Sequence, residues 1–132
     1  MPKKLFTLIE ANALLPKLRP LFEKFLDLQE KHAEDEDGYH EVYFTIANNG
    51  KDFESEKLKE KKEMVEGDEE ELDALTQQIE SFGCEIKGVD PPLIDFPTKM
   101  DGKDAYLCWR VDEEEIHYWH DMESGYGGRQ PL

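Results

Sequence analysis

The side chains best suited to chemistry lie in the last part of the chain, EIHYWHDMESGYGGRQPL, residues 115–132. The imidazole of His120 is followed by carboxylates at Asp121 and Glu123. Imidazole combined with carboxylate or thiolate is the donor set of zinc and iron sites in proteins. One hypothesis is therefore a divalent metal site at His120, Asp121 and Glu123, which Cys108 or Glu10 would complete.

A purely structural role for His120 is the interpretation that the sequence favours over a metal site. The segment reads as a strand, and residues three apart on a strand point to opposite faces. His117 and His120 are therefore not expected to hold the same ion. His120 would then form a hydrogen bond in a corner of a sheet, with Trp119 in the core.

Arg129 is the second chemical candidate, because its guanidinium can bind a carboxylate through two parallel hydrogen bonds. Its partner is either an internal acid, for example Asp95 or Glu10, or an anionic ligand. Arg110 would share either role. A ligand site is predicted where the start of the first helix meets the last two strands, with these candidates: Glu10, Asn12, Cys108, Arg110 and Arg129.

Catalytic residues cannot be named from this sequence. It contains no Ser-His-Asp order, P-loop or Gly-x-Gly-x-x-Gly fingerprint. Cys108, next to Trp109, is expected to be buried and unreactive, since a reactive thiolate needs a depressed pKa. An enzymatic role stays open, and a non-enzymatic binding module is the first hypothesis.

The charge of the chain restricts its partners. The net charge is −16, and residues 34–82 carry 17 acidic and five basic side chains. Such a surface repels nucleic acids and anionic membranes. The favoured partners are cations, basic protein surfaces or a second copy of the chain. Two cysteines and the lack of a signal-peptide pattern predict a cytoplasmic protein with reduced thiols.

A helical hairpin is predicted over residues 7–82. Thr7 and Glu10 form a capping box, and apolar residues then recur every three or four positions as far as Ala47. Pro16 predicts a kink or a restart. Residues 39–47 fit a helix better than a strand, and Asn48-Asn49-Gly50 predicts a turn. A second helix is predicted from about Phe53 to Phe82, ended by Gly83.

The apolar period changes to two after Gly83, which predicts an antiparallel sheet of three to four strands. The predicted strands are Cys84–Lys87, Leu93–Phe96 ending at Pro97, Ala105–Val111 and Glu115–His120. The fold class is therefore α+β in one domain, 1–132, with the hairpin at 7–82 and the sheet and tail at 83–132. The long apolar seam exceeds what two helices cover, so we predict a homodimer through the hairpin.

Four segments resemble one known family: FTLIEANALLPKLRPL, LIDFP, AYLCWR and EIHYWHDMESGYGGRQPL. The family consists of small uncharacterised bacterial proteins, a domain of unknown function with the family number 2203. The resemblance implies a bacterial cytoplasmic protein with a compact helix-plus-sheet domain, and it implies no activity or cofactor. The family usually turns with a Gly-Glu pair between the last two strands, where this chain has Asp112-Glu113-Glu114.

Overall fold

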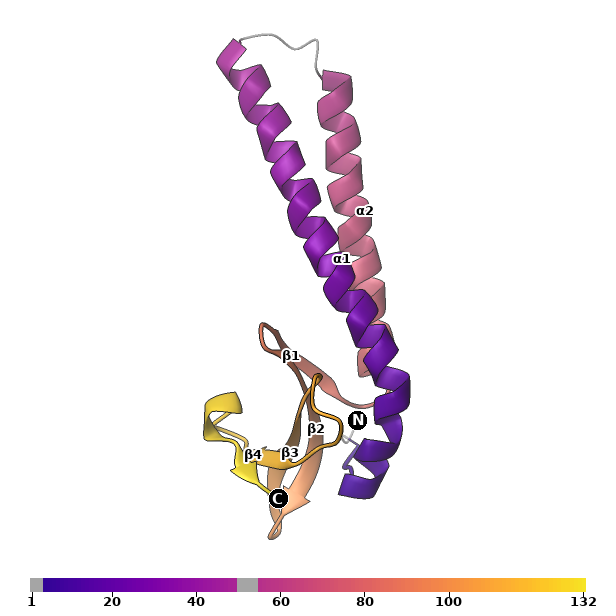
Figure 1. The fold of residues 1–132 in the computed structure, drawn as a ribbon, viewed down its shortest axis with the longest axis vertical. Helices are drawn as coiled ribbons and strands as arrows, with labels where there is room; N and C mark the ends of the chain where they lie inside the picture. The colour runs from indigo at the N-terminus through magenta and orange to yellow at the C-terminus, as the bar shows by residue number, and fades with distance from the viewer. Residues whose placement is uncertain (1–3, 50–54) are drawn as a thin grey trace. The chain divides into compact units, whose positions relative to one another are not determined.

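The computed structural model describes residues 4–49 and 55–132. Within these described residues, two helices precede five short strands and one 3₁₀ turn, which confirms the predicted α+β class with one strand more than expected (Figure 1). No helix in the described ranges has the length and apolar character of a membrane span. The elements in chain order are α1 Leu8–Asn49, α2 Ser55–Glu80, β1 Glu85–Val89, β2 Pro92–Met100, β3 Lys103–Arg110, β4 Tyr118–Asp121, η1 Tyr126–Gly128 and β5 Gln130–Pro131.

Contacts divide the chain into two compact units. The first unit comprises Met1–Glu23 and Thr76–Leu132, and the second comprises Lys24–Leu75. The expectation of a single domain stays a prediction.

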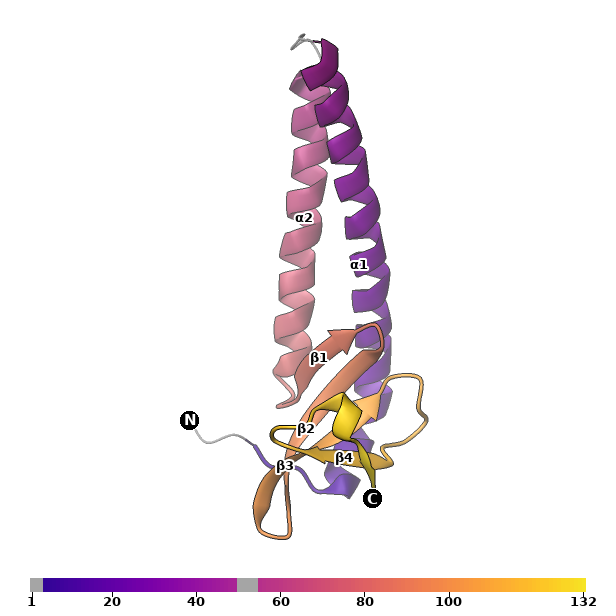
Figure 2. The ribbon, with the colours of Figure 1, turned by 90° about the vertical axis from the view of Figure 1, so that its left-hand side faces the viewer.

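The second unit is a hairpin in which the two helices lie side by side (Figure 2). Residues 39–47 are helical, as predicted. Leu28 and Leu75 are buried. Asp68, which interrupts the apolar seam, is also buried and accepts a hydrogen bond from Lys31 at 2.8 Å. Asn48 and Asn49, the first two residues of the predicted turn, are helical. The third residue, Gly50, lies outside the described residues.

Helix α1 begins with the predicted capping box. The backbone N–H of Glu10 donates to Thr7 Oγ1 at 3.1 Å, and that of Thr7 donates to Glu10 Oε1 at 2.9 Å. The helix then continues through Pro16 and Pro20, so the predicted restart at Pro16 is wrong. Both prolines are exposed, and water can hydrogen-bond the carbonyls that lose their helical donors.

The five strands of the first unit are antiparallel and lie in sequence order, β1-β2-β3-β4-β5. Strand β2 does not end at Pro97 as predicted but continues to Met100. In an antiparallel pair, the N–H and C=O of one residue point to the same side. The carbonyl of Pro97 accepts from Phe6 at 2.7 Å, so the missing N–H of Pro97 faces away from β3 and costs no ladder hydrogen bond.

Strand β4 begins at Tyr118 instead of at the predicted Glu115. Side chains of α1 bind the backbone of the preceding segment and replace strand partners there. Asn12 Oδ1 accepts from the N–H of Ile116 at 2.9 Å, and Arg19 donates to the carbonyl of Val111 at 2.6 Å. The start of α1 and the region before the last strands therefore meet, as the sequence predicts.

The sheet has one apolar face and one face that carries polar side chains. Phe96, Leu107 and Trp109 of the apolar face are buried, and the Arg19 guanidinium lies 5.2 Å from the Trp109 ring centroid. This face contributes to one core with buried α1 residues: Ala11, Leu15, Leu18 and Phe22. The opposite face carries polar side chains from β2, β3 and β4.

Candidate functional site

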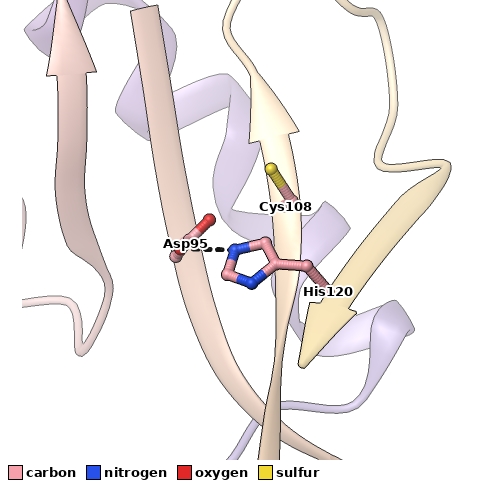
Figure 3. Close-up of side chains that lie close together, drawn as sticks. All are labelled: Asp95, Cys108 and His120. Carbon is pink, nitrogen blue, oxygen red and sulfur yellow. Dashed lines mark hydrogen bonds and ion pairs between the residues drawn. The ribbon is translucent and has the colours of Figure 1, made fainter. Parts of the chain in front are cut away.

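Three polar side chains meet on the face of the sheet opposite the apolar core: Asp95, Cys108 and His120. They come from β2, β3 and β4, respectively (Figure 3). Asp95 lies directly opposite Cys108 in the register, and His120 lies opposite Tyr106, two residues from Cys108. Because strand side chains alternate with a period of two, this register brings all three to one face.

Both ring nitrogens of His120 have oxygen partners. Nδ1 lies 2.7 Å from the backbone carbonyl of Asp121, and Nε2 lies 2.8 Å from Oδ2 of Asp95. A carbonyl cannot donate, so Nδ1 carries a proton. The contact with Asp95 holds a second proton, which is bound either to Nε2 or to the carboxyl group.

The cluster is shielded from water. Asp95, Cys108 and His120 are 2%, 1% and 3% exposed. Burial raises the pKa of Asp95, and the charge of His120 opposes this shift. Burial also raises the pKa of Cys108 to about 11, and the nearby Asp95 charge adds to that effect. At neutral pH the thiol therefore keeps its proton.

One atom of the cluster is left without a partner. Oδ1 of Asp95 is buried and has no hydrogen-bond partner of good geometry among residues 4–49 and 55–132, and the neighbouring Cys108 thiol is only a weak donor to this carboxyl group. A buried, unsatisfied carboxylate oxygen costs about 1–3 kcal/mol or more, because it has lost its hydration without replacement. Such an atom calls for an explanation, and a bound ligand supplies one.

A cavity of about 270 Å³ opens beside the cluster. Because Asp95, Cys108 and His120 all line it, an ion or small molecule in this cavity would lie next to them. Its wall is completed by Lys87, Leu93, Tyr106, Met122, Glu123, Gly125 and Tyr126.

The arrangement fits metal ligation better than nucleophilic catalysis. A cysteine nucleophile needs a depressed pKa and a free histidine nitrogen as base, whereas the pKa of Cys108 is raised and both nitrogens of His120 are engaged. One ligand atom from each of the three residues lies within 4.8 Å of the others. A divalent ion would displace the protons and bind all three groups.

A second group of metal-ligand type lies in the hairpin unit: His32, Glu36 and Glu69. His32 Nε2 lies 3.0 Å from Glu36 and 3.5 Å from Glu69. The Glu36 and Glu69 side chains are 45% and 57% exposed, so water already solvates their charges. An ion would gain less here than at the buried cluster.

Of the predicted metal ligands, the cluster contains His120 but neither Asp121 nor Glu123. The Asp121 side chain instead accepts from the backbone N–H groups of Glu123 and Ser124, at 3.0 and 2.8 Å. The hydrogen bond from the backbone N–H of Ser124 contributes most to the lowered pKa of Asp121. Glu123 lines the cavity, and His117 is exposed whereas His120 is buried, as the alternation predicts.

The predicted ligand-binding candidates divide between structural contacts and the cluster. Glu10 caps α1, Asn12 holds Ile116, and Arg110 pairs with Asp112 at 2.9 Å. Cys108 belongs to the cluster. The candidates as a set are therefore not brought to one site.

Arg129 pairs with an internal acid, Glu113, and not with either of the examples named from the sequence, Asp95 or Glu10. Its Nη2 donates to Glu113 Oε1 at 2.6 Å and to the carbonyl of Cys108 at 3.0 Å. Its guanidinium also lies over the Tyr118 ring, 4.2 Å from the centroid. Arg129 thus fastens the tail to the sheet beside the cluster.

Asp95 is the site residue that sequence reasoning missed, since it was considered only as a partner for Arg129. The signal was the alternation in LIDFP, residues 93–97, where Asp95 shares a face with apolar Leu93 and Pro97. An acid in such a position is buried only if it has a partner or a ligand.

The chain matches the family model described as an uncharacterized conserved protein, DUF2203, over residues 4–132. The chain therefore belongs to this family, as the resemblance of its segments implied. No curated protein and no solved structure matches the chain.

Proposed function

We propose that this member of the DUF2203 family is a metal-binding protein that holds one divalent transition-metal ion at Asp95, Cys108 and His120. The unpartnered, buried Oδ1 of Asp95, within a group of three potential ligands, carries the proposal. An ion would satisfy that oxygen and would replace the shared proton of Asp95 and His120.

The donor set favours zinc or ferrous iron over calcium or magnesium. Thiolate and imidazole are ligands of transition metals, whereas calcium and magnesium take oxygen ligands. The bond from Nδ1 of His120 to the Asp121 carbonyl supports the same choice. Metal-binding histidines usually donate their second ring N–H in this way, which fixes the ring for ligation through Nε2.

Three protein ligands leave one tetrahedral position for water or another molecule, as in catalytic zinc sites. The cavity beside the cluster supplies the space for that fourth ligand. Glu123 lines the same cavity and is the one side chain of the wall that could close the position with a carboxylate. If Glu123 took the fourth position, the site would be structural. If the position stayed open, the ion could act as a Lewis acid.

Elemental analysis of protein purified without an affinity tag tests this function. We expect close to one equivalent of zinc or iron per chain, and its loss in His120→Ala. His117→Ala is the matched control, since this exposed histidine lies three residues away and should leave the metal content unchanged. Less than a tenth of an equivalent in the unmodified protein after growth in metal-supplemented medium would refute the proposal.

A second candidate function is self-association through the hairpin. The apolar seam of the Lys24–Leu75 unit is half-buried along much of its length, at Tyr39, Val42, Ile46, Leu58, Val65 and Leu72. Tyr43 and Phe44 are 49% and 60% exposed. Two further helices from a second copy would cover this surface in a four-helix bundle.

Light scattering at two ionic strengths tests self-association. The surrounding acidic side chains repel a second copy, so we expect the homodimer to strengthen as salt screens them. Phe44→Asp should abolish the dimer, whereas Ile9→Asp, an exposed apolar position in the other unit, should not. A monomer of 15.4 kDa at high protein concentration and high salt would refute this candidate.

A further inference from the structure

A second cavity, of about 300 Å³, adjoins the cavity at the metal cluster. The two cavities share Tyr106 and Met122 in their walls. Tyr106 lies opposite His120 on one side and opposite Pro97 on the other, so the second cavity continues along the same face of the sheet. The wall of this second cavity consists of Leu5, Pro97, Thr98, Asp104, Ala105, Tyr106 and Met122.

The second cavity is mainly apolar and partly covered by exposed side chains. Leu5 is 46% exposed and Met122 is 51% exposed, although both are apolar. An apolar ligand group would remove both from water, which is favourable in proportion to the area covered. Met122 stands between the two cavities, and its unbranched, flexible side chain can move aside for a ligand that occupies both.

The size of the cavities agrees with one ligand that spans them. Pockets for small molecules typically measure about 300–1,000 Å³. Each cavity alone is at or below the lower end of that range. Taken together, they lie well within it.

Charge selects the head group of such a ligand. A divalent ion held by one carboxylate and one thiolate forms a site without net charge, which can accept one anionic ligand. Lys87 lines the metal cavity, with its Nζ 5.1 Å from the Tyr106 ring centroid and 3.3 Å from Glu85. The positive charge of Lys87 attracts an anionic ligand, and the negative charge of Glu123 repels it. Because water screens the exposed Glu123, coordination to the ion contributes most to binding.

We propose that the natural ligand of the site is a small carboxylic acid with an apolar tail. Its carboxylate occupies the open position of the metal ion, and its tail lies in the cavity formed by Leu5, Pro97, Tyr106 and Met122. This inference rests on the proposed metal site and names the class of molecule that the site recognises.

The test uses cobalt-loaded protein and two probes, acetate and hexanoate. Cobalt(II) reports changes in its own coordination through its visible spectrum, so one titration measures both affinities. We expect hexanoate to bind about tenfold or more tightly than acetate, because its additional methylenes are buried. Leu5→Asp and Met122→Asp should each reduce this preference, whereas Ile9→Asp, at an 82% exposed apolar residue outside the cavity, should retain it.

The outcomes separate this inference from the metal site itself. Equal affinities for the two probes, or a hexanoate preference unchanged in both cavity variants, would overturn the carboxylic-acid inference alone. The absence of any cobalt spectrum before carboxylate is added would overturn the metal site and this inference with it.

Discussion

Nε2 of His120 lies 2.8 Å from Oδ2 of Asp95, although strand β3 separates the strands that carry these residues. The two side chains meet above β3, beside the thiol of Cys108 (Figure 3). A buried acid and a buried imidazole that share a proton form a pair that a metal ion can enter by displacing that proton.

Metal uptake should release about two protons per ion, one from Cys108 and one from the Asp95–His120 pair. The pKa of Cys108 is raised to about 11, so the thiol is protonated across the neutral range. Apparent metal affinity should therefore rise with pH, by about tenfold per unit for each proton released. Calorimetry in buffers of different ionisation enthalpy measures the number of protons released per ion.

Asp95→Asn is the control for the proton count. Its amide donates to a neutral Nε2, so the shared proton is absent and about one proton fewer should be released. An affinity independent of pH in the unmodified protein would contradict the assignment of Cys108 as a ligand.

Neither cysteine should react with iodoacetamide in the native, metal-free protein at pH 8. Burial raises the pKa of Cys84 to about 12 and that of Cys108 to about 11, so the thiolate fraction is very small. Mass spectrometry should detect two adducts after denaturation and none before it. Rapid alkylation of Cys108 in the folded protein would instead indicate an activated thiol.

Arg129→Gln should destabilise the first unit by roughly 1–2 kcal/mol, because it removes the charged partner of Glu113 and two hydrogen bonds. The value is smaller than for a fully buried pair, since water partly screens both groups. Arg110→Gln is the control, because its ion pair with Asp112 is exposed and should contribute less to stability. Equal losses in urea unfolding would show that Arg129 has no special role in fastening the tail.

Phe22→Ala should cost about 3–5 kcal/mol, since the side chain is fully buried in the core of the first unit. Ile9→Ala, on the exposed side of the same helix, should change stability by no more than about 0.5 kcal/mol. Denaturant titrations of both variants measure the difference. A tolerated Phe22→Ala would contradict the placement of α1 in the core.

The sequence alone was sufficient for the architecture, because each element depends on local patterns. The capping box at Thr7 and Glu10, the helical spacing through residues 39–47 and the alternation after Gly83 are all confirmed. The sequence predicted a kink or a restart at Pro16, but the helix is continuous there. Each proline removes one backbone donor, and water can bond the carbonyl that is left, so the helix does not end. The continuation of β2 past Pro97 was missed because it depends on strand register. The missing N–H of Pro97 points away from β3, so the hydrogen bonds between β2 and β3 are kept.

The site was predicted only in part, because its geometry depends on strand register. His120 and Cys108 were recognised by residue type, but Asp95 joins them only when β2 and β3 pair with Asp95 opposite Cys108. Asp121 was chosen for its carboxylate, and it contributes its backbone carbonyl instead. Glu113 was missed as the partner of Arg129 because no spacing rule relates the two residues.

Cobalt(II) titration of the metal-free protein tests the central claim most directly. The claim predicts a thiolate-to-cobalt charge-transfer band that saturates at one equivalent, is lost in Cys108→Ser and His120→Ala, and persists in Cys84→Ser and His117→Ala. A band absent from the unmodified protein, or one that survives Cys108→Ser, would contradict a metal site at Asp95, Cys108 and His120.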